Sequence, residues 1–179
     1  MDLYYFDDPE KGLARATSHP FFVEHATADF YYDGGDEFAP FGNDTGYDLL
    51  RDLEEWYQER GANTKVAVWL RQLIIAWGFN PAYLHYNTQA QLETVNPEEQ
   101  YLNDVLDKAV IATILGQCKI AGKADKAMQE MVANAFMRQR YMTALANAPD
   151  DPWEEAEFYL SRLAIVEADL AAMATKKAR

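Results

Sequence analysis

The sequence is poor in the residues that most often build reactive sites. Its 179 residues include one cysteine (Cys118), two serines and three histidines. A single cysteine excludes an intramolecular disulfide, and two serines leave little choice for a serine nucleophile. His19 and His25 are six residues apart and would face different sides of a helix, whereas zinc usually needs three or four converging ligands. These shortages argue against disulfide-stapled, serine-hydrolase and histidine–zinc proteins.

Recognisable signatures and long apolar runs are also missing. The chain contains no glycine-rich phosphate loop, no His-Glu-x-x-His motif and no Cys-x-x-Cys pair. Its most apolar stretch, residues 66–79, is interrupted by Arg71 and Gln72 and falls short of the roughly 20 residues that span a bilayer. The first residues lack the basic and apolar regions of a secretory signal. We therefore expect a cytoplasmic protein that is not an enzyme and uses no cofactor or metal.

Basic side chains are scarce in the first third of the chain. Residues 1–60 hold 15 Asp and Glu against 4 Lys and Arg, and no lysine or arginine stands between Arg15 and Arg51. The net charge of the whole chain is −13. A negative field of this size repels nucleic-acid phosphates and anionic lipids. We expect no direct binding to nucleic acid or membranes, and a basic protein as the partner.

Apolar and aromatic residues, by contrast, are plentiful. Hydrophobic residues make up 49% and aromatic residues 13% of a 20.4 kDa chain, a composition that excludes disorder. A chain of this length can bury a full core as one domain. We expect a single domain over residues 1–179, with an irregular acidic and aromatic segment over residues 1–44 and a helical bundle over residues 45–175.

The apolar residues after residue 44 recur at helical spacing. Thr45 and Asp48 form a start signal for a helix over residues 46–60. The next helix, over about residues 66–77, is apolar nearly all round, so we expect it to be the most buried. This pattern predicts a mainly α-helical fold.

Proline and aspartate mark the later helices. Asn80-Pro81 and Asn96-Pro97 each place a capping residue before a proline at the first helical position. The first pair predicts a short helix or turn, and the second a long segment to Gly122 with a break near Asn103. Asp125 and Asp151-Pro152 predict two more helices. The result is a bundle of four or more helices.

Residues 1–44 follow a different pattern. Residues 3–6 and 29–32 are short, aromatic and bounded by turn residues, which makes them candidate β-strands. Residues 33–36, Asp-Gly-Gly-Asp, predict a turn, because glycine adopts positive φ at no steric cost.

Residues 30–48 form the strongest candidate site. Structural roles account for part of it: Phe38 and Phe41 would enter the core, and residues 43–48 would cap the next helix. Capping needs only one or two carboxylates, so others are left without a local partner. Acidic groups interleaved with aromatic rings suit a basic protein surface. The candidate partner-binding residues are Tyr32, Asp33, Asp36, Glu37, Asp44 and Asp48.

The side chains of Asp33, Asp36 and Glu37 are expected to be at least half exposed and to form no buried ion pair. Asp44 and Asp48 are the expected capping residues. With Asn43, these acids are also dense enough for a calcium cage, although their spacing departs from the EF-hand pattern. A metal-dependent enzyme or a calcium-binding regulator is therefore an alternative function.

Two features lie on the later helices. Cys118 stands among apolar residues and is expected to be a small buried hydrophobe. Met128, Met131, Met137 and Met142 fall on one predicted helix, where most such residues fill the core. A structural protein that self-associates through this helix and the C-terminal helix is another alternative, and the sequence gives no expectation for the oligomeric state.

Several blocks of the sequence resemble the bacterial YfeS-like proteins. The most specific is residues 39–48, Ala-Pro-Phe-Gly-Asn-Asp-Thr-Gly-Tyr-Asp; His19-Pro20, Tyr32-Asp33, Asp36-Glu37, residues 77–79, 107–112 and 116–125 also match. Lys108 and Ala124 depart from the family pattern. The resemblance covers roughly residues 18–140. It implies a cytoplasmic bacterial protein and no particular activity.

The leading hypothesis is an immunity protein that neutralises a bacterial toxin by direct binding. A small acidic domain without a catalytic signature is typical of proteins that capture a basic partner. Electrostatic steering raises association rates by about 10 to 10³, and fast capture protects a cell from an incoming toxin.

Overall fold

The computed structural model describes residues 3–59, 61–95 and 97–175. These residues form seven α-helices and contain no β-strand, which confirms the mainly α-helical class. The α-helices are α1 (Pro20–His25), α2 (Asp44–Glu59), α3 (Val66–Ala76), α4 (Gln89–Glu93), α5 (Gln100–Ala121), α6 (Lys126–Ala146) and α7 (Ala156–Thr175). Short 3-10 helices join them: η1 (Arg15–Thr17), η2 (Asp29–Tyr32), η3 (Asn63–Lys65), η4 (Pro81–His85) and η5 (Pro97–Glu99).

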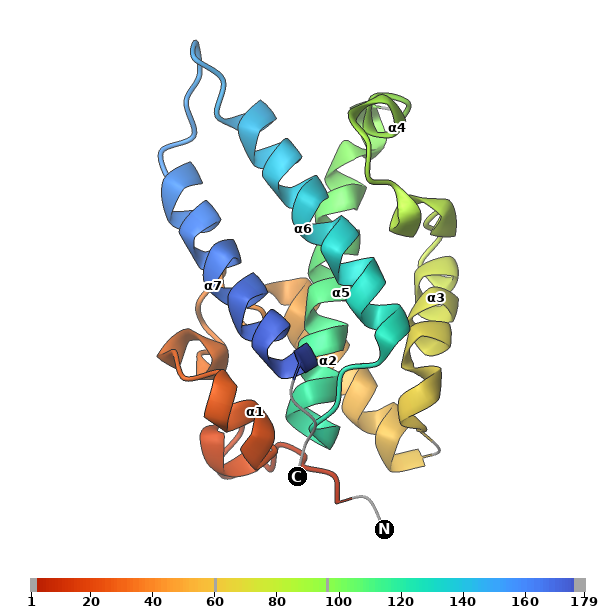
Figure 1. The fold of residues 1–179 in the computed structure, drawn as a ribbon, viewed down its shortest axis with the longest axis vertical. Helices are drawn as coiled ribbons and strands as arrows, with labels where there is room; N and C mark the ends of the chain where they lie inside the picture. The colour runs from red at the N-terminus through yellow and green to blue at the C-terminus, as the bar shows by residue number, and fades with distance from the viewer. Residues whose placement is uncertain (1–2, 60, 96, 176–179) are drawn as a thin grey trace.

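Helix α5 runs through the centre of the bundle (Figure 1) and contacts α1, α2, α3 and α6. Every residue from Leu106 to Ala121 is buried except Lys108, which is partly buried. The prediction that residues 66–77 form the most buried helix is therefore wrong. Helix α3 lies at the side of the bundle, so only one of its sides packs, and Val68 and Ile75 remain 54% and 51% exposed.

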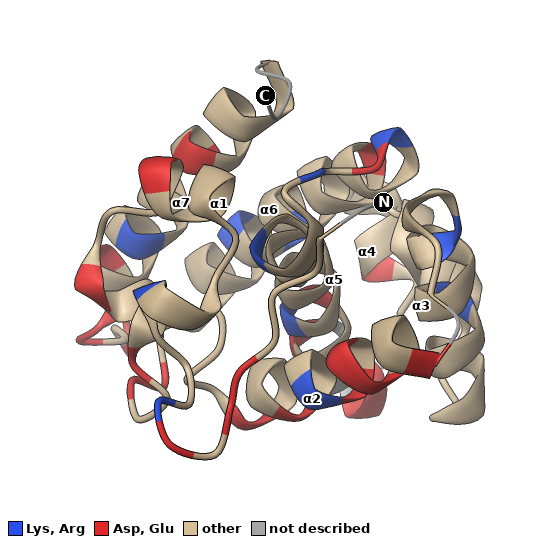
Figure 2. Ribbon diagram, turned by 90° about the horizontal axis from the view of Figure 1, so that it is seen from below, with Lys and Arg blue, Asp and Glu red and all other residues tan. Residues whose placement is uncertain are grey.

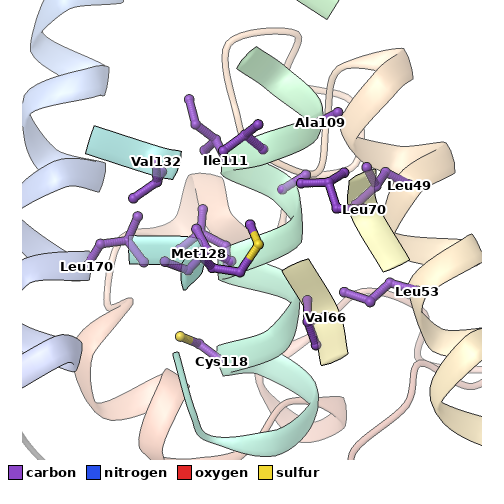
Figure 3. Packing of buried hydrophobic residues seen from close by; sticks show 14 of the residues in the cluster. Leu49, Leu53, Val66, Leu70, Ala109, Ile111, Cys118, Met128, Val132 and Leu170 are labelled. Atoms are coloured by element: carbon purple, nitrogen blue, oxygen red, sulfur yellow. The ribbon is translucent and has the colours of Figure 1, made fainter. Parts of the chain in front are cut away.

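One hydrophobic cluster draws side chains from six of the seven α-helices, all except α4. Figure 3 shows Leu49 and Leu53 of α2 and Leu70 of α3 pointing toward α5 from one side. Met128 of α6 and other side chains approach α5 from the opposite side. Cys118 is fully buried in this cluster, and burial raises the pKa of its thiol to about 12. The expected role of Cys118 as a buried hydrophobe is confirmed.

The two predicted strands of the first segment are not strands. Residues 29–32 form η2, and residues 3–6 have no regular structure, because neither lies beside a partner strand. Hydrogen bonds from both segments instead hold the N-terminal part of the chain to the bundle. The buried Tyr31 donates its hydroxyl to Asp169 of α7 at 2.7 Å, and the backbone N–H of Tyr5 donates to Ile120 of α5 at 2.9 Å.

Several helix boundaries differ from the predicted ones. Helix α2 begins at Asp44, and its cap is Asn43, whose Oδ1 accepts the Gly46 N–H at 2.7 Å. The predicted capping role of Asp44 and Asp48 is therefore wrong. Helix α5 continues without a break through residue 103, and α7 begins at Ala156.

Two further expectations concern the ends of the elements. The Asn80 side chain accepts the Ala82 N–H at 3.0 Å and caps η4, as predicted. Asn96, the other predicted cap before proline, lies outside the described residues.

No helix among residues 3–59, 61–95 and 97–175 has both the length and the apolar character needed to cross a membrane.

Candidate functional site

Residues 39–48, the block that carries the most specific resemblance, build a tight turn over residues 39–43 and the first residues of α2. Phe41 is fully buried, as expected. A Cβ atom on Gly46 would lie 1.8 Å from the Pro40 carbonyl oxygen, and one on Gly42 would lie 2.1 Å from the Asp36 oxygen. Only glycine fits at either position. The turn therefore sets the direction of α2 and of the acidic side chains that follow.

Asp36 is anchored to the bundle and is not the free surface charge that we expected. Its Oδ2 forms an ion pair with Arg162 of α7 at 2.7 Å, and the two side chains are only 21% and 14% exposed. The guanidinium of Arg162 also lies 4.1 Å from the ring centre of Phe30. Local sequence gave no sign of this pair because its partners are 126 positions apart.

The other predicted residues of the N-terminal segment have mixed environments. The Tyr32 hydroxyl donates to the Ala26 carbonyl at 2.9 Å, and the Arg15 guanidinium lies 4.4 Å from its ring centre. Burial raises the pKa of Tyr32 to about 12. Asp33 is exposed, and its Oδ1 accepts the Gly35 N–H at 2.9 Å, which shapes the predicted turn. Glu37 is exposed.

The outer side of α2 carries five exposed carboxylates. At about 100° per residue, they fall within an arc of about 80°, opposite the buried leucines of the same helix. Figure 2 shows acidic positions in red along α2. None of them forms an ion pair with a basic side chain among the described residues. We call this surface the acidic ridge: Asp44, Asp48, Asp52, Glu55 and Glu59.

Arg51, the arginine within α2, does not neutralise the acidic ridge, because its guanidinium pairs with carboxylates on the inner side of the helix. Arg51 pairs with Asp7, which is 1% exposed, and with Glu54 at 3.0 Å. Asp7 also forms an ion pair with the buried Lys119, whose Nζ lies 2.6 Å from the Asp7 Oδ1. Partial burial first, and then the carboxylates of Glu55 and Asp48, raise the pKa of Asp52. The ridge charges therefore repel one another, and a cationic partner would relieve that repulsion.

Sequence reasoning found two members of the acidic ridge, Asp44 and Asp48, and missed Asp52, Glu55 and Glu59. The signal was available: acids at positions 44, 48, 52, 55 and 59 recur every three or four residues and so share one helical face.

The proposed calcium cage has no counterpart in the geometry. Among the described residues, no group of three or more His, Cys, Asp or Glu side chains is placed to hold a metal ion. Asp36 faces Arg162, whereas Asp44 and Asp48 stand on the outer side of α2.

A second polar cluster lies inside the bundle and joins three elements. The fully buried Asp107 of α5 accepts Arg138 Nε at 2.8 Å and Gln139 Nε2 at 2.8 Å, both from α6. Arg138 also donates to the Tyr86 carbonyl at 2.9 Å, which holds the segment after η4. Burial raises the pKa of Asp107 to about 6, against the opposing effect of Arg138. The cluster has the closed geometry of a structural cross-link.

Comparison with known proteins places the chain in a family. It is 34% identical over 145 residues to a protein of Escherichia coli strain K12 named "Uncharacterized protein YfeS". The chain belongs to the YfeS-like family. The resemblance drawn from residues 39–48 and the other blocks is thus confirmed. The match covers 78% of this chain and 57% of the YfeS protein, so the chain spans little more than half of that relative's length. No family model and no solved structure matches the chain.

Proposed function

We propose that this protein is a binding domain that captures a basic protein partner through the acidic ridge of α2. The observation that carries the proposal is a row of five exposed carboxylates without basic partners among the described residues. The row stands on a helix that packs against the centre of the bundle, so binding would not have to order a loop. This is the role of a binding protein and not of an enzyme.

The partner that we favour is a bacterial toxin that acts in the cytoplasm, which would make the protein an immunity protein. Many toxins that attack nucleic acids carry basic surfaces, because their substrates are polyanions. An acidic ridge complements such a surface and speeds the encounter by long-range attraction. Glu37 and Asp33, both exposed next to the turn before α2, would extend the same negative surface.

The proposal is tested by co-expression with the neighbouring reading frame, followed by co-purification and a growth assay. We expect a complex, and growth rescue if the neighbour is toxic. The triple variant Asp48→Asn, Asp52→Asn, Glu55→Gln should weaken both. Its control removes the same charges between α6 and α7: Asp150→Asn, Asp151→Asn, Glu154→Gln, all exposed. Recovery of the protein alone, with no rescue from a toxic neighbour, would refute the proposal.

The calcium-regulator alternative has its own readout. A protein that binds calcium in the folded state gains stability with the free ion concentration. A melting temperature that rises with added calcium and falls again with chelator would favour that alternative. The binding domain proposed here should melt at the same temperature in both solutions.

A further inference from the structure

A cleft of about 640 Å³ opens between residues 37–45 and helices α5, α6 and α7. One wall is aromatic: Phe38, Trp153 and Tyr159 lie with ring centres 5.6 to 6.4 Å apart, and all three residues are partly exposed. The volume is within the range of sites that hold small molecules.

The rim of the cleft is negatively charged. Glu37 and Asp44 belong to residues 37–45, and Glu155 lies just before α7; all three are exposed and pair with no basic group among the described residues. Asp104 also lines the cleft, but its charge is matched by Lys108 at 2.7 Å. The lining therefore keeps three uncompensated negative charges beside an aromatic wall. Only Asp44 is shared with the acidic ridge.

The base of the cleft is held in place by the buried polar cluster. Gln139 lines the cleft, is 2% exposed, and donates its amide to Asp107 at 2.8 Å. Its carbonyl oxygen accepts the hydroxyl of Tyr159, so the ring that forms part of the wall is fixed from behind. A site with its side chains already oriented loses less entropy when a ligand enters.

We propose that this cleft binds an organic cation, an alkylammonium or guanidinium group on an alkyl chain. Aromatic faces attract such cations, and unpaired carboxylates form charge-assisted hydrogen bonds with their N–H groups. The alkyl part packs on the aromatic wall. The cation is either a free polyamine or a lysine or arginine side chain of a protein, and the second source rests on the function proposed above.

Isothermal titration calorimetry with two probes tests the site and separates the sources. The probes are spermidine and the neutral-ended peptide acetyl-Gly-Arg-Gly-amide. We expect saturable binding of at least one probe to the wild-type protein. The variant Glu37→Gln, Glu155→Gln should weaken it at least tenfold. The control Glu24→Gln, Glu130→Gln removes the same charge at exposed positions that belong neither to the cleft nor to the acidic ridge, and it should change affinity less than threefold.

A further variant tests the aromatic wall. Trp153→Leu keeps an apolar side chain and removes the ring, so it should weaken binding without changing the charge. Binding of spermidine alone assigns the cleft to a free cation, and binding of the peptide alone assigns it to a protein side chain. Equal weakening by the two glutamate variants, or no saturable binding of either probe, overturns the proposal. Capture of a basic protein through the acidic ridge is measured separately and can stand if the cleft fails.

Discussion

Two neighbouring residues of α2, Glu54 and Glu55, show how differently this protein uses its acids. Glu54 faces inward, is 5% exposed, accepts the Asp7 N–H at 2.6 Å and pairs with Arg51. Glu55 faces outward on the acidic ridge, and no described basic residue pairs with it. The inner acids, Glu54, Asp7 and Asp107, each have cationic partners, whereas the ridge acids have none among the residues that the structure describes. The inner acids cross-link the fold, and the ridge acids remain available to a partner.

The largest effect should come from Asp107→Ala, an inner acid. The change leaves the buried Arg138 without its carboxylate, and breaking a buried pair costs about 3 to 5 kcal/mol of the free energy of unfolding. The control is Asp104→Ala, which breaks the more exposed pair with Lys108 and should cost at most about 1 kcal/mol. Urea denaturation measures both. Equal midpoints for the two variants would contradict the division between inner and outer acids.

Asp36→Asn should have an intermediate effect. It removes the charge that faces Arg162 but keeps an oxygen that can accept the Phe38 N–H, so we expect a loss of about 1 to 2 kcal/mol. Asp33→Asn, at an exposed position, should change stability by no more than about 0.5 kcal/mol. Chemical denaturation of the two variants compares them. If Asp36→Asn is as stable as Asp33→Asn, then Asp36 belongs with the free surface charges after all.

Asn43→Ala should cost about 1 kcal/mol, because the Asn43 side chain caps α2. Asp48→Ala, one turn into the helix on the acidic ridge, should change stability by no more than about 0.5 kcal/mol. Thermal and urea denaturation would show the difference. A larger loss for Asp48→Ala would restore the capping role that the sequence predicted for it.

The smallest effect should be a slight gain from Asp52→Asn on the acidic ridge. The pKa of Asp52 is raised in the folded protein, so its ionised form opposes folding. We expect a gain of up to about 0.5 kcal/mol at neutral pH. The gain should disappear as the pH falls below the ordinary value of 3.8, where both states bind the proton. Urea midpoints of the variant and wild type at about pH 7 and about pH 3.5 test this sign; a loss at neutral pH would contradict it.

Helices could be predicted from the sequence where the signal is local, that is, where apolar residues recur at helical spacing or a proline or glycine marks an end. The apolar stripe of α2, the proline after Asn80 and the glycine after α5 mark elements that the structure contains. The central position of α5 could not be predicted, because Asp107 and Lys119 make that helix look less apolar than α3. Their burial depends on Arg138 and Asp7, which are distant in the sequence.

The candidate site was predictable only in part, for the same reason. The density of acids in residues 30–48 was visible, but it did not show which of them have a partner. Asp36 is paired through a contact with α7, and Tyr32 is held by Arg15 and Ala26. The acidic ridge follows a helical spacing that is visible in the sequence of α2. The cleft, whose lining comes from four parts of the chain, required the three-dimensional structure.

The most direct test of the central claim is the rate of association with the co-purified basic partner, measured by stopped flow over a range of salt concentrations. The wild-type rate should fall steeply as salt is added. The variant Asp48→Asn, Asp52→Asn, Glu55→Gln should associate about tenfold more slowly at low salt and depend less on salt, while dissociation changes little. The control Asp150→Asn, Asp151→Asn, Glu154→Gln should stay close to wild type. Equal rates for the two triple variants would mean that net charge alone drives capture, and would contradict a binding role for the acidic ridge.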